Sequence, residues 1–312
     1  MQEEGFKSFT LLMQINNCIW IFFDQFTATS MRQSNMENNI DILTVQSFGD
    51  EWTRFNQESL SVGESTSIFR DYFSIFPWDD LPANSEGFDM GCGTGRWARF
   101  VAPQVTRLNC IDPSSSLEIA RQNLSAFPNV IFHSSFACNS NLLPSSQDFG
   151  YSLGVLHHVP DTLAAIKSCT KLLKPGAPLL LYLYYAFDNR PRWFRYIWHV
   201  SNFWRLQICR LPPRPKQFIT DIIALTIYWP LASVSRIAER IGLPVSAIPL
   251  SYYRKCSFYT MRTDSRDRFG TPLEKRFSKK QIIEMCAEAG LVDLRFSNKA
   301  PFWCVIGFKA KN

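Results

Sequence analysis

Short apolar runs alternate with amphipathic segments from about residue 62 onward. The apolar runs at 87–90, 106–112, 129–135, 149–156 and 177–185 have the length and composition of buried strands. The segments between them carry apolar residues at helical spacing, and Asp161 is placed to cap the helix that follows it. Strands that alternate with helices in this way predict a parallel sheet in a doubly wound α/β fold.

The alternation stops near residue 187 and resumes near residue 273. There an amphipathic segment ends at Gly290, and two apolar runs follow, separated by "NKAP", as in a hairpin. We therefore expect a doubly wound, Rossmann-like α/β fold with a seven-stranded sheet, a C-terminal antiparallel hairpin and a mainly helical insertion before the last helix. The expected parts are a poorly ordered extension (1–45), a core (46–186), the insertion (187–272) and the completion of the core (273–312).

A glycine-rich stretch, "FDMGCGTGRWARF" at 88–100, follows the first expected strand. A dinucleotide fingerprint would require glycine or alanine at position 96, which is arginine here. Gly91, Gly93 and Gly95 instead form G-x-G-x-G, which leaves backbone N–H groups free for a small carboxylate or a phosphate. Asp112 ends the second expected strand, where a carboxylate can accept both hydroxyls of a ribose. The glycine loop and Asp112 together predict a site for a nucleoside with a compact charged tail.

Four stretches resemble, in order and spacing, the class I S-adenosylmethionine-dependent methyltransferases, in particular their small-molecule branch of the type 11/25 kind. They are "FDMGCGTGRWA", "CIDPSSSLEIAR", "FGYSLGVLHHVPD" and "LLKPGAPLLLYLYY". The resemblance covers about 85–186 and returns at 273–312. It implies S-adenosyl-L-methionine as the cofactor and methyl transfer as the reaction.

The resemblance also implies the cofactor-binding residues. These are Asp89, Gly91, Cys92, Gly93, Thr94, Gly95, Asp112, Pro113, Ser135, Phe136, Ala137, Leu153 and Gly154. Asp89 would orient the amino group of the cofactor, Asp112 would hold its ribose, and Leu153 and Gly154 would border its methionine end. Phe136 stands where the family often has an acid that binds the adenine amino group. Adenine recognition would then depend on the backbone of Ala137 or on Ser135.

Candidate catalytic residues lie at the carboxyl edge of the expected sheet, where ligands bind in such folds. His157 and His158 follow the fourth strand, and Tyr184 and Tyr185 end the fifth. One of the two histidines, or Tyr185, is a candidate base or pocket residue if the acceptor is a hydroxyl or an acidic carbon. The alternative is that both histidines only fix the loop before Asp161. No cluster of His, Cys, Asp or Glu has the spacing of a metal site, so we expect no metal.

The insertion carries the basic excess of the chain: residues 187–272 hold 14 Lys or Arg against 5 Asp or Glu, in a chain of formal net charge +6. Aromatic residues are interleaved with these charges. Three interpretations stay open: a lid with a solvated basic face, peripheral contact with an anionic membrane or lipid-linked acceptor, and nucleic-acid binding. Arg254, Arg262, Arg266 and Arg268 could grip an acidic acceptor, but we expect them to pair locally with Asp264 and Asp267. Trp52 and Phe55 could form walls over the cofactor cleft or pack in the core.

Composition adds limits on location. The nine cysteines include no C-x-x-C pair, as expected for free thiols in a reducing cytoplasm. The N-terminus has no basic region typical of a signal peptide, and the longest apolar runs, such as 222–234, are shorter than the roughly 20 residues of a membrane span. We therefore expect a cytoplasmic enzyme, with peripheral membrane contact left open and its oligomeric state undetermined.

The predicted function is methyl transfer to an oxygen or carbon atom of a small molecule or of a lipid or saccharide precursor. One alternative is a methyltransferase that acts on nucleic acid or protein through the basic insertion. Another is a non-catalytic protein that binds the cofactor. After the fourth strand the chain has "SLGV" in place of the Asn/Asp-Pro-Pro-aromatic stretch of enzymes that methylate base amino groups, which disfavours that chemistry.

Overall fold

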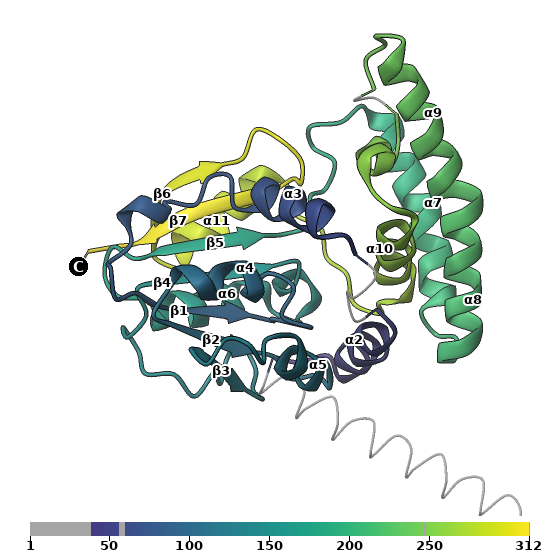
Figure 1. The fold of residues 1–312 in the computed structure, drawn as a ribbon. Helices are drawn as coiled ribbons and strands as arrows, with labels where there is room; N and C mark the ends of the chain where they lie inside the picture. The colour runs from purple at the N-terminus through teal and green to yellow at the C-terminus, as the bar shows by residue number, and fades with distance from the viewer. Residues whose placement is uncertain (1–38, 56–59, 246–247, 312) are drawn as a thin grey trace, which may run out of the picture.

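The computed structural model describes residues 39–55, 60–245 and 248–311. A seven-stranded sheet forms its centre, with strand order β3-β2-β1-β4-β5-β7-β6. The strands are β1 (Glu86–Met90), β2 (Arg107–Ile111), β3 (Val130–His133), β4 (Phe149–Leu153), β5 (Pro178–Tyr182), β6 (Leu291–Phe296) and β7 (Cys304–Lys309). The first five are parallel, and β7 runs antiparallel to both β5 and β6. The predicted fold class, including the C-terminal hairpin, is confirmed (Figure 1).

Helices cover both faces of the sheet. The described core helices are α2 (Ile42–Arg54), α3 (Val62–Tyr72), α4 (Ala98–Val101), α5 (Ser116–Asn123), α6 (Thr162–Leu172) and α11 (Lys279–Glu288), with 3-10 turns η1 (Trp78–Asp80), η2 (Ala102–Gln104) and η3 (Leu156–His158). As predicted, Asp161 caps α6: its carboxylate accepts the Ala164 N–H at 3.0 Å. Ser278 and Gln281 form a capping box at the start of α11.

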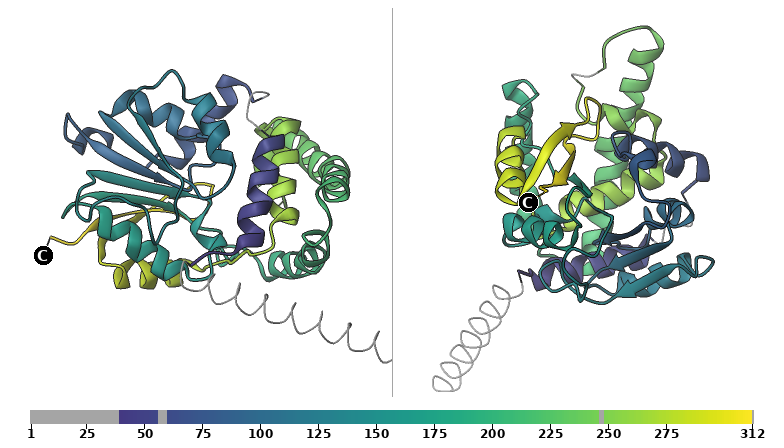
Figure 2. Two further views of the ribbon diagram at one scale, coloured as in Figure 1. Left: turned by 90° about the horizontal axis from the view of Figure 1, so that it is seen from below. Right: turned by 90° about the vertical axis from the view of Figure 1, so that its left-hand side faces the viewer.

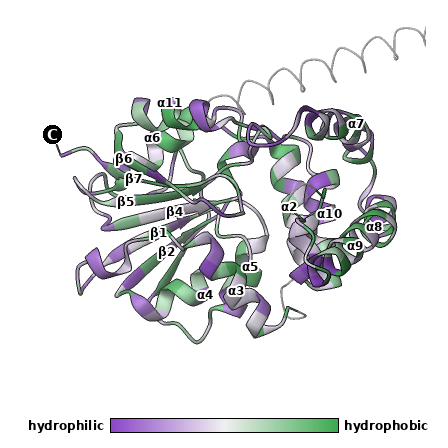
Figure 3. Cartoon of the chain, turned by 90° about the horizontal axis from the view of Figure 1, so that it is seen from above, coloured by the Kyte–Doolittle hydropathy of each residue, from purple (hydrophilic) through white to green (hydrophobic). Residues whose placement is uncertain are grey.

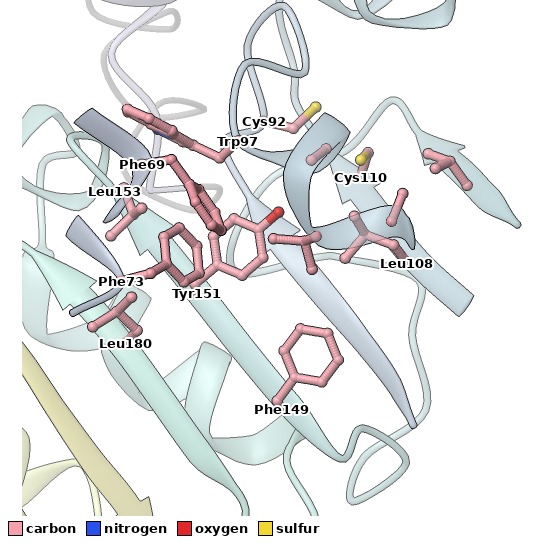
Figure 4. Packing of buried hydrophobic residues seen from close by; sticks show 14 of the residues in the cluster. Phe69, Phe73, Cys92, Trp97, Leu108, Cys110, Phe149, Tyr151, Leu153 and Leu180 are labelled. Carbon is pink, nitrogen blue, oxygen red and sulfur yellow. The ribbon is translucent and has the colours of Figure 1, made fainter. Parts of the chain in front are cut away.

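Two buried clusters hold these layers together. One lies between the sheet and α3, α4 and α5, where Phe73 stacks on Phe69 and meets Tyr151 of β4 edge to face at 5.2 Å between ring centroids (Figure 4). The other lies between the sheet and α6 and α11, around Leu179, Leu181 and Ile282. β4 and most of β5 are buried, as the near-continuous apolar runs predicted.

Residues 187–272 form a layer of helices beyond the carboxyl edge of the sheet (Figure 2). They are α7 (Arg192–Ile208), α8 (Pro213–Ile223), the π-helical segment η4 (Ala224–Tyr228), α9 (Trp229–Arg240), the 3-10 turn η5 (Ser251–Lys255) and α10 (Phe258–Gly270). α10 packs against α2, α7 and α8, and α2 also packs against α5. The layer is thus tied to the sheet through α2 and α10.

One expectation about this layer was wrong. The segments α8, η4 and α9 run as one 28-residue helix, Pro213–Arg240, which is long and apolar enough to cross a membrane by length and composition alone. Sequence inspection missed it because Lys216, Gln217 and Asp221 interrupt the apolar run, whereas the average over the helix stays hydrophobic. Only 28% of its most apolar window is buried. Of the expected N-terminal extension, residues 1–38 lie outside the described part of the chain.

Candidate functional site

The glycine loop joins β1 to α4 and contains Gly91, Gly93 and Gly95. The physical reason that favours glycine differs among the three positions. All three adopt positive φ angles. A Cβ atom on Gly91 would lie 2.5 Å from the Val155 side chain, and one on Gly95 would lie 2.6 Å from Leu124. At Gly93 the nearest atom is 3.6 Å away, on the indole of Trp52. Gly91 and Gly95 therefore allow close packing, whereas at Gly93 a Cβ atom would make only an ordinary contact with Trp52 and the positive φ angle favours glycine.

Asp112 connects this loop to the end of β2. Its Oδ2 atom accepts the Gly93 N–H at 2.9 Å, and its Oδ1 atom accepts the Ser114 N–H at 2.8 Å and the Ser114 hydroxyl at 2.6 Å. Burial raises the pKa of Asp112, while these hydrogen bonds oppose that rise. The carboxylate is thus preorganised by its own neighbours at one wall of the site.

Asp89 lies beneath the loop and does not line the cavity described next. The carboxyl is buried, and its Oδ2 atom has no partner among the described residues. Burial raises the pKa of Asp89 to about 8, with a further contribution from nearby Asp112. The carboxyl of Asp89 is therefore buried outside the cavity and protonated near neutral pH.

A cavity of about 1010 Å³ extends from the glycine loop into the helical layer. Its wall includes these residues predicted for the site: Gly91, Cys92, Gly93, Thr94, Asp112, Pro113, Leu153, Gly154, His158 and Tyr185. It also includes Trp52, one of the two aromatic residues considered as walls, whereas Phe55 is buried against Tyr259. The structure thus brings the two ends of the predicted site, cofactor loop and candidate base, onto one continuous surface.

The remaining predicted residues lie away from this wall. Gly95 packs on Leu124, and Ser135, Phe136 and Ala137 follow β3, where Phe136 bridges to Asn139. His157 is fully buried, and its ring lies 3.8 Å from the ring of Tyr184 between centroids. Burial lowers the pKa of His157 well below its usual value. Of the two histidines, only His158 faces the cavity.

His158 is held in one orientation. Its Nδ1 atom lies 2.6 Å from the carbonyl oxygen of Leu273, so Nδ1 must carry the proton and donate it. The other ring nitrogen, Nε2, lies 3.9 Å from Oδ1 of Asp267 on α10. The Tyr184 hydroxyl donates a short hydrogen bond to the other oxygen of Asp267. The imidazole thus presents an acceptor nitrogen beside a buried carboxylate, as in sites of general base catalysis.

Sequence reasoning did not place Asp267, Asp264 or Glu51 in the site, although all three line the cavity. Glu51 is fully buried on α2, and neither carboxylate oxygen has a partner among the described residues. Burial, followed by the nearby carboxylate of Asp267, raises the pKa of Glu51 well above its usual value. Glu51 adjoins Trp52 in the sequence, so its neighbour was considered as a cleft wall while the carboxylate itself was not.

The expected pairing of the arginines with Asp264 and Asp267 was wrong. Arg262 pairs with Asp221, Arg266 with Asp50, and Arg268 with Glu274, while Arg254 pairs with Glu239. The two aspartates instead accept tyrosine hydroxyls, Asp264 from Tyr253 at 2.8 Å and Asp267 from Tyr184. On a helix, Arg262 and Arg266 project away from the face that carries the two aspartates toward the cavity, and they meet α8 and α2 there.

Two arginines around the buried carboxylate of Glu274 form one side of the cavity. Arg268 and Arg276 each lie 2.8 Å from the buried carboxylate of Glu274. Burial would raise the pKa of Glu274, but the two guanidinium groups hold it below its usual value. Arg276 also lies over the rings of Tyr184, Phe187 and Trp198. Both arginines are therefore engaged in the wall of the cavity.

Comparison with known proteins finds similarity in the central part of the chain. Residues 88–179 match a family model described as a methyltransferase domain. The chain is 32% identical over 91 residues to the ubiquinone biosynthesis O-methyltransferase of Vibrio cholerae serotype O1, covering 28% of this chain and 37% of that protein. It is 26% identical over 159 residues to the enzyme of the same name from Nitrosospira multiformis, covering 47% of this chain and 64% of that protein. The chain spans between about a third and two thirds of these relatives.

Among solved structures, a phosphoethanolamine N-methyltransferase of Haemonchus contortus aligns with 81% of this chain at 15% identity and a TM-score of 0.45. The alignment covers 46% of that chain. At this level of similarity no inference about substrate follows. The matched region of our chain contains β1 to β4, the glycine loop, Asp112 and His158, but neither α2 nor the helical layer.

Proposed function

We propose that this chain, whose residues 88–179 match the model of a methyltransferase domain, is a class I S-adenosylmethionine-dependent methyltransferase and transfers a methyl group to an oxygen or carbon atom of a small molecule or of a lipid or saccharide precursor. The observation that carries this proposal is the single cavity that joins the glycine loop and Asp112 to His158. A donor held at the loop and an acceptor held at His158 would share one continuous cavity.

The residues at the loop fit the cofactor of this family. The Thr94 side chain lines the cavity, and its hydroxyl is buried without a partner among the described residues. Asp112 would hold the ribose, and Leu153 and Gly154 would border the methionine end. When bound, S-adenosylmethionine supplies an already activated methyl group, so the protein mainly has to position the acceptor and exclude water.

His158 is the residue best placed to take a proton from the acceptor. Its Nδ1–H is fixed on Leu273, so Nε2 is free to accept a proton inside the cavity. Asp267, 3.9 Å away, would stabilise the imidazolium that results. Tyr185, whose ring lies 4.6 Å from that of Phe187 and 5.8 Å from that of Phe302 between centroids, would shape the acceptor site.

We also propose that the enzyme works in the cytoplasm at the surface of a membrane. All the described cysteines are free, which fits a reducing compartment. Exposed aromatic and aliphatic residues of α7, α8, η4 and α9 fit peripheral contact with lipid. The arginine-rich segment 254–268 supports a nucleic-acid partner less well, because Arg254, Arg262, Arg266 and Arg268 already pair with acids of this chain.

The test is transfer of a radiolabelled methyl group from S-adenosylmethionine in extracts, sorted into water-soluble, solvent-extractable and macromolecular fractions. Label in either of the first two fractions, lost in Asp112→Ala, supports the proposal. Label confined to RNA, DNA or protein would favour the macromolecular alternative. Cofactor binding without transfer to any fraction would favour a non-catalytic protein that binds the cofactor.

A further inference from the structure

The cavity has two chemically different ends. Its polar end holds His158, Asp264, Asp267 and Glu51. From there it continues between α7 and the α8–η4–α9 helix, where the wall consists of apolar or aromatic side chains: Phe194, Ile208, Ile219, Ile223, Tyr228 and Leu231. We call this second part the apolar arm. Its lining would exclude a fully polar acceptor and favour a hydrocarbon chain.

The apolar arm reaches the surface of the molecule. Tyr196, Trp204 and Ile227 line the cavity, yet 71%, 58% and 46% of their respective surfaces are exposed. Ile197 and Val200 of α7 share both properties. These five residues form a rim between α7 and η4, through which the arm opens.

The surface around this rim is also apolar. The same helices expose further large hydrophobic side chains. They are Trp193, Phe203, Leu206, Phe218, Ile222, Leu225, Trp229, Val234 and Ile237. In Figure 3, hydrophobic and hydrophilic residues are mixed along α7, α8 and α9. An exposed apolar face of this extent, surrounding a cavity rim, is typical of an interaction site.

The charges on these helices indicate the partner. Between residues 192 and 240, the exposed charged residues are Arg192, Arg195, Arg210, Arg214 and Arg240, together with Glu239, which pairs with Arg254. Exposed Trp, Phe and aliphatic residues combined with arginine, and almost no acid, are characteristic of helices that lie in the interface of an anionic bilayer.

We infer that the methyl acceptor is an amphiphile whose hydrocarbon chain occupies the apolar arm and enters it directly from an anionic lipid bilayer on which α7, α8, η4 and α9 rest. This inference rests on the proposed methyl transfer. On this path the hydrocarbon chain of the acceptor stays in apolar surroundings from the bilayer to the cavity, while the polar group of the acceptor reaches His158. A water-soluble acceptor of the same head group would lack the larger part of the binding energy.

The experiment uses two neighbouring isoleucines. Ile223 lines the arm, whereas Ile222 is exposed on the same helix and does not line it. Binding of hexyl, octyl and decyl maltoside, each below its critical micelle concentration, is measured by calorimetry on the full chain. For the wild type we expect one site, with affinity rising about fourfold per buried methylene group. Ile223→Trp should weaken decyl maltoside binding at least about tenfold, and Ile222→Trp should leave it within about twofold.

Two further measurements keep the result decisive. Affinity for S-adenosylmethionine, titrated on the same preparations, reports whether each variant is folded, and Ile219→Trp with the exposed control Phe218→Trp repeats the comparison one turn earlier. If the wild type bound the maltosides but not S-adenosylmethionine, the proposed methyl transfer would be overturned while the chain site would stand. Equal effects at Ile222 and Ile223, or affinity independent of chain length, would overturn the chain site.

Sedimentation velocity and flotation with phosphatidylglycerol vesicles show whether a bilayer or a second copy of this chain covers the apolar face. A monomer that floats with these vesicles supports entry from the bilayer. A stable dimer that fails to float would mean that a second copy of this chain covers the apolar face, and it would overturn bilayer entry.

Discussion

The Nε2 atom of His158 lies 3.9 Å from the Oδ1 atom of Asp267, and the two residues come from different parts of the molecule. His158 belongs to the turn after β4, within the matched methyltransferase domain, and Asp267 belongs to α10 of the helical layer. The polar end of the cavity is therefore completed by a residue that the domain itself does not contain.

The first prediction concerns this pair. His158→Gln should lower kcat by about 10²–10⁴-fold with little change in KM, because it removes a proton acceptor and leaves the cavity wall in place. Asp267→Asn should lower kcat by a smaller factor, since it removes only the charge that stabilises the imidazolium. Steady-state kinetics on the identified acceptor provides the measurement. His157→Gln is the matched control, and an equal loss of kcat in that variant would contradict the role given to His158.

The second prediction concerns the cofactor. Asp112→Ala should weaken S-adenosylmethionine binding by about 1.5–3 kcal/mol, as expected for a lost hydrogen bond to a charged group. Titration calorimetry measures the effect directly. Ser114→Ala removes one of the donors to Asp112 and keeps the carboxylate, so it should weaken binding less. Unchanged affinity in Asp112→Ala would mean that the cofactor site is placed wrongly.

Much of the fold could be predicted because its signals are local. The apolar runs of β4 and β5, the cap at Asp161 and the glycines of the loop each act through neighbours in sequence. These signals determine the order of strands and helices, and with it the edge at which Gly93, Asp112 and His158 meet.

The acceptor side could not be predicted in the same way. Asp267 reaches His158 only because α10 packs against α2 and α7, and Glu51 reaches the cavity only because α2 packs against α10. No periodic pattern marks contacts between helices so far apart in the chain. The spacing of charges along the sequence was misleading here. Arg262 forms an ion pair with Asp221 of α8 and Arg266 with Asp50 of α2, and neither pairs with Asp264 or Asp267 on its own helix.

The third prediction concerns Asp89 and pH. Its pKa is about 8 in the folded protein against 3.8 as the ordinary value, so the folded state holds this proton more tightly than the unfolded state. Stability therefore falls as pH rises from about 4 toward about 8, by up to about 1.4 kcal/mol per pH unit from this group. Asp89→Asn does not titrate and lacks this penalty.

Urea unfolding without cofactor, at about pH 5 and about pH 7, measures the difference in unfolding free energy between Asp89→Asn and wild type. From about pH 5 to about pH 7, the unfolding free energy of Asp89→Asn should rise by roughly 2 kcal/mol relative to that of the wild type. Asp79→Asn, at an exposed carboxylate, should show no comparable trend. A difference for Asp89→Asn that is flat with pH would mean that Asp89 is not a buried, protonated acid.

The last prediction concerns membrane contact and separates its two components. Trp204→Glu places a charge in the exposed apolar face, and Arg192→Glu reverses one of its flanking charges. Each should reduce flotation with phosphatidylglycerol vesicles, the arginine variant by about fivefold or more, since one basic residue near such a surface contributes about 1 kcal/mol. Added salt should weaken the electrostatic part of wild-type binding to the vesicles and leave the apolar contribution in place.

Arg107→Glu, at an exposed arginine of β2 far from these helices, is the control and should float as the wild type does. If Trp204→Glu and Arg192→Glu both floated with anionic vesicles as well as the wild type does, contact through α7, α8, η4 and α9 would be excluded, because neither the charge nor the apolar face would then matter.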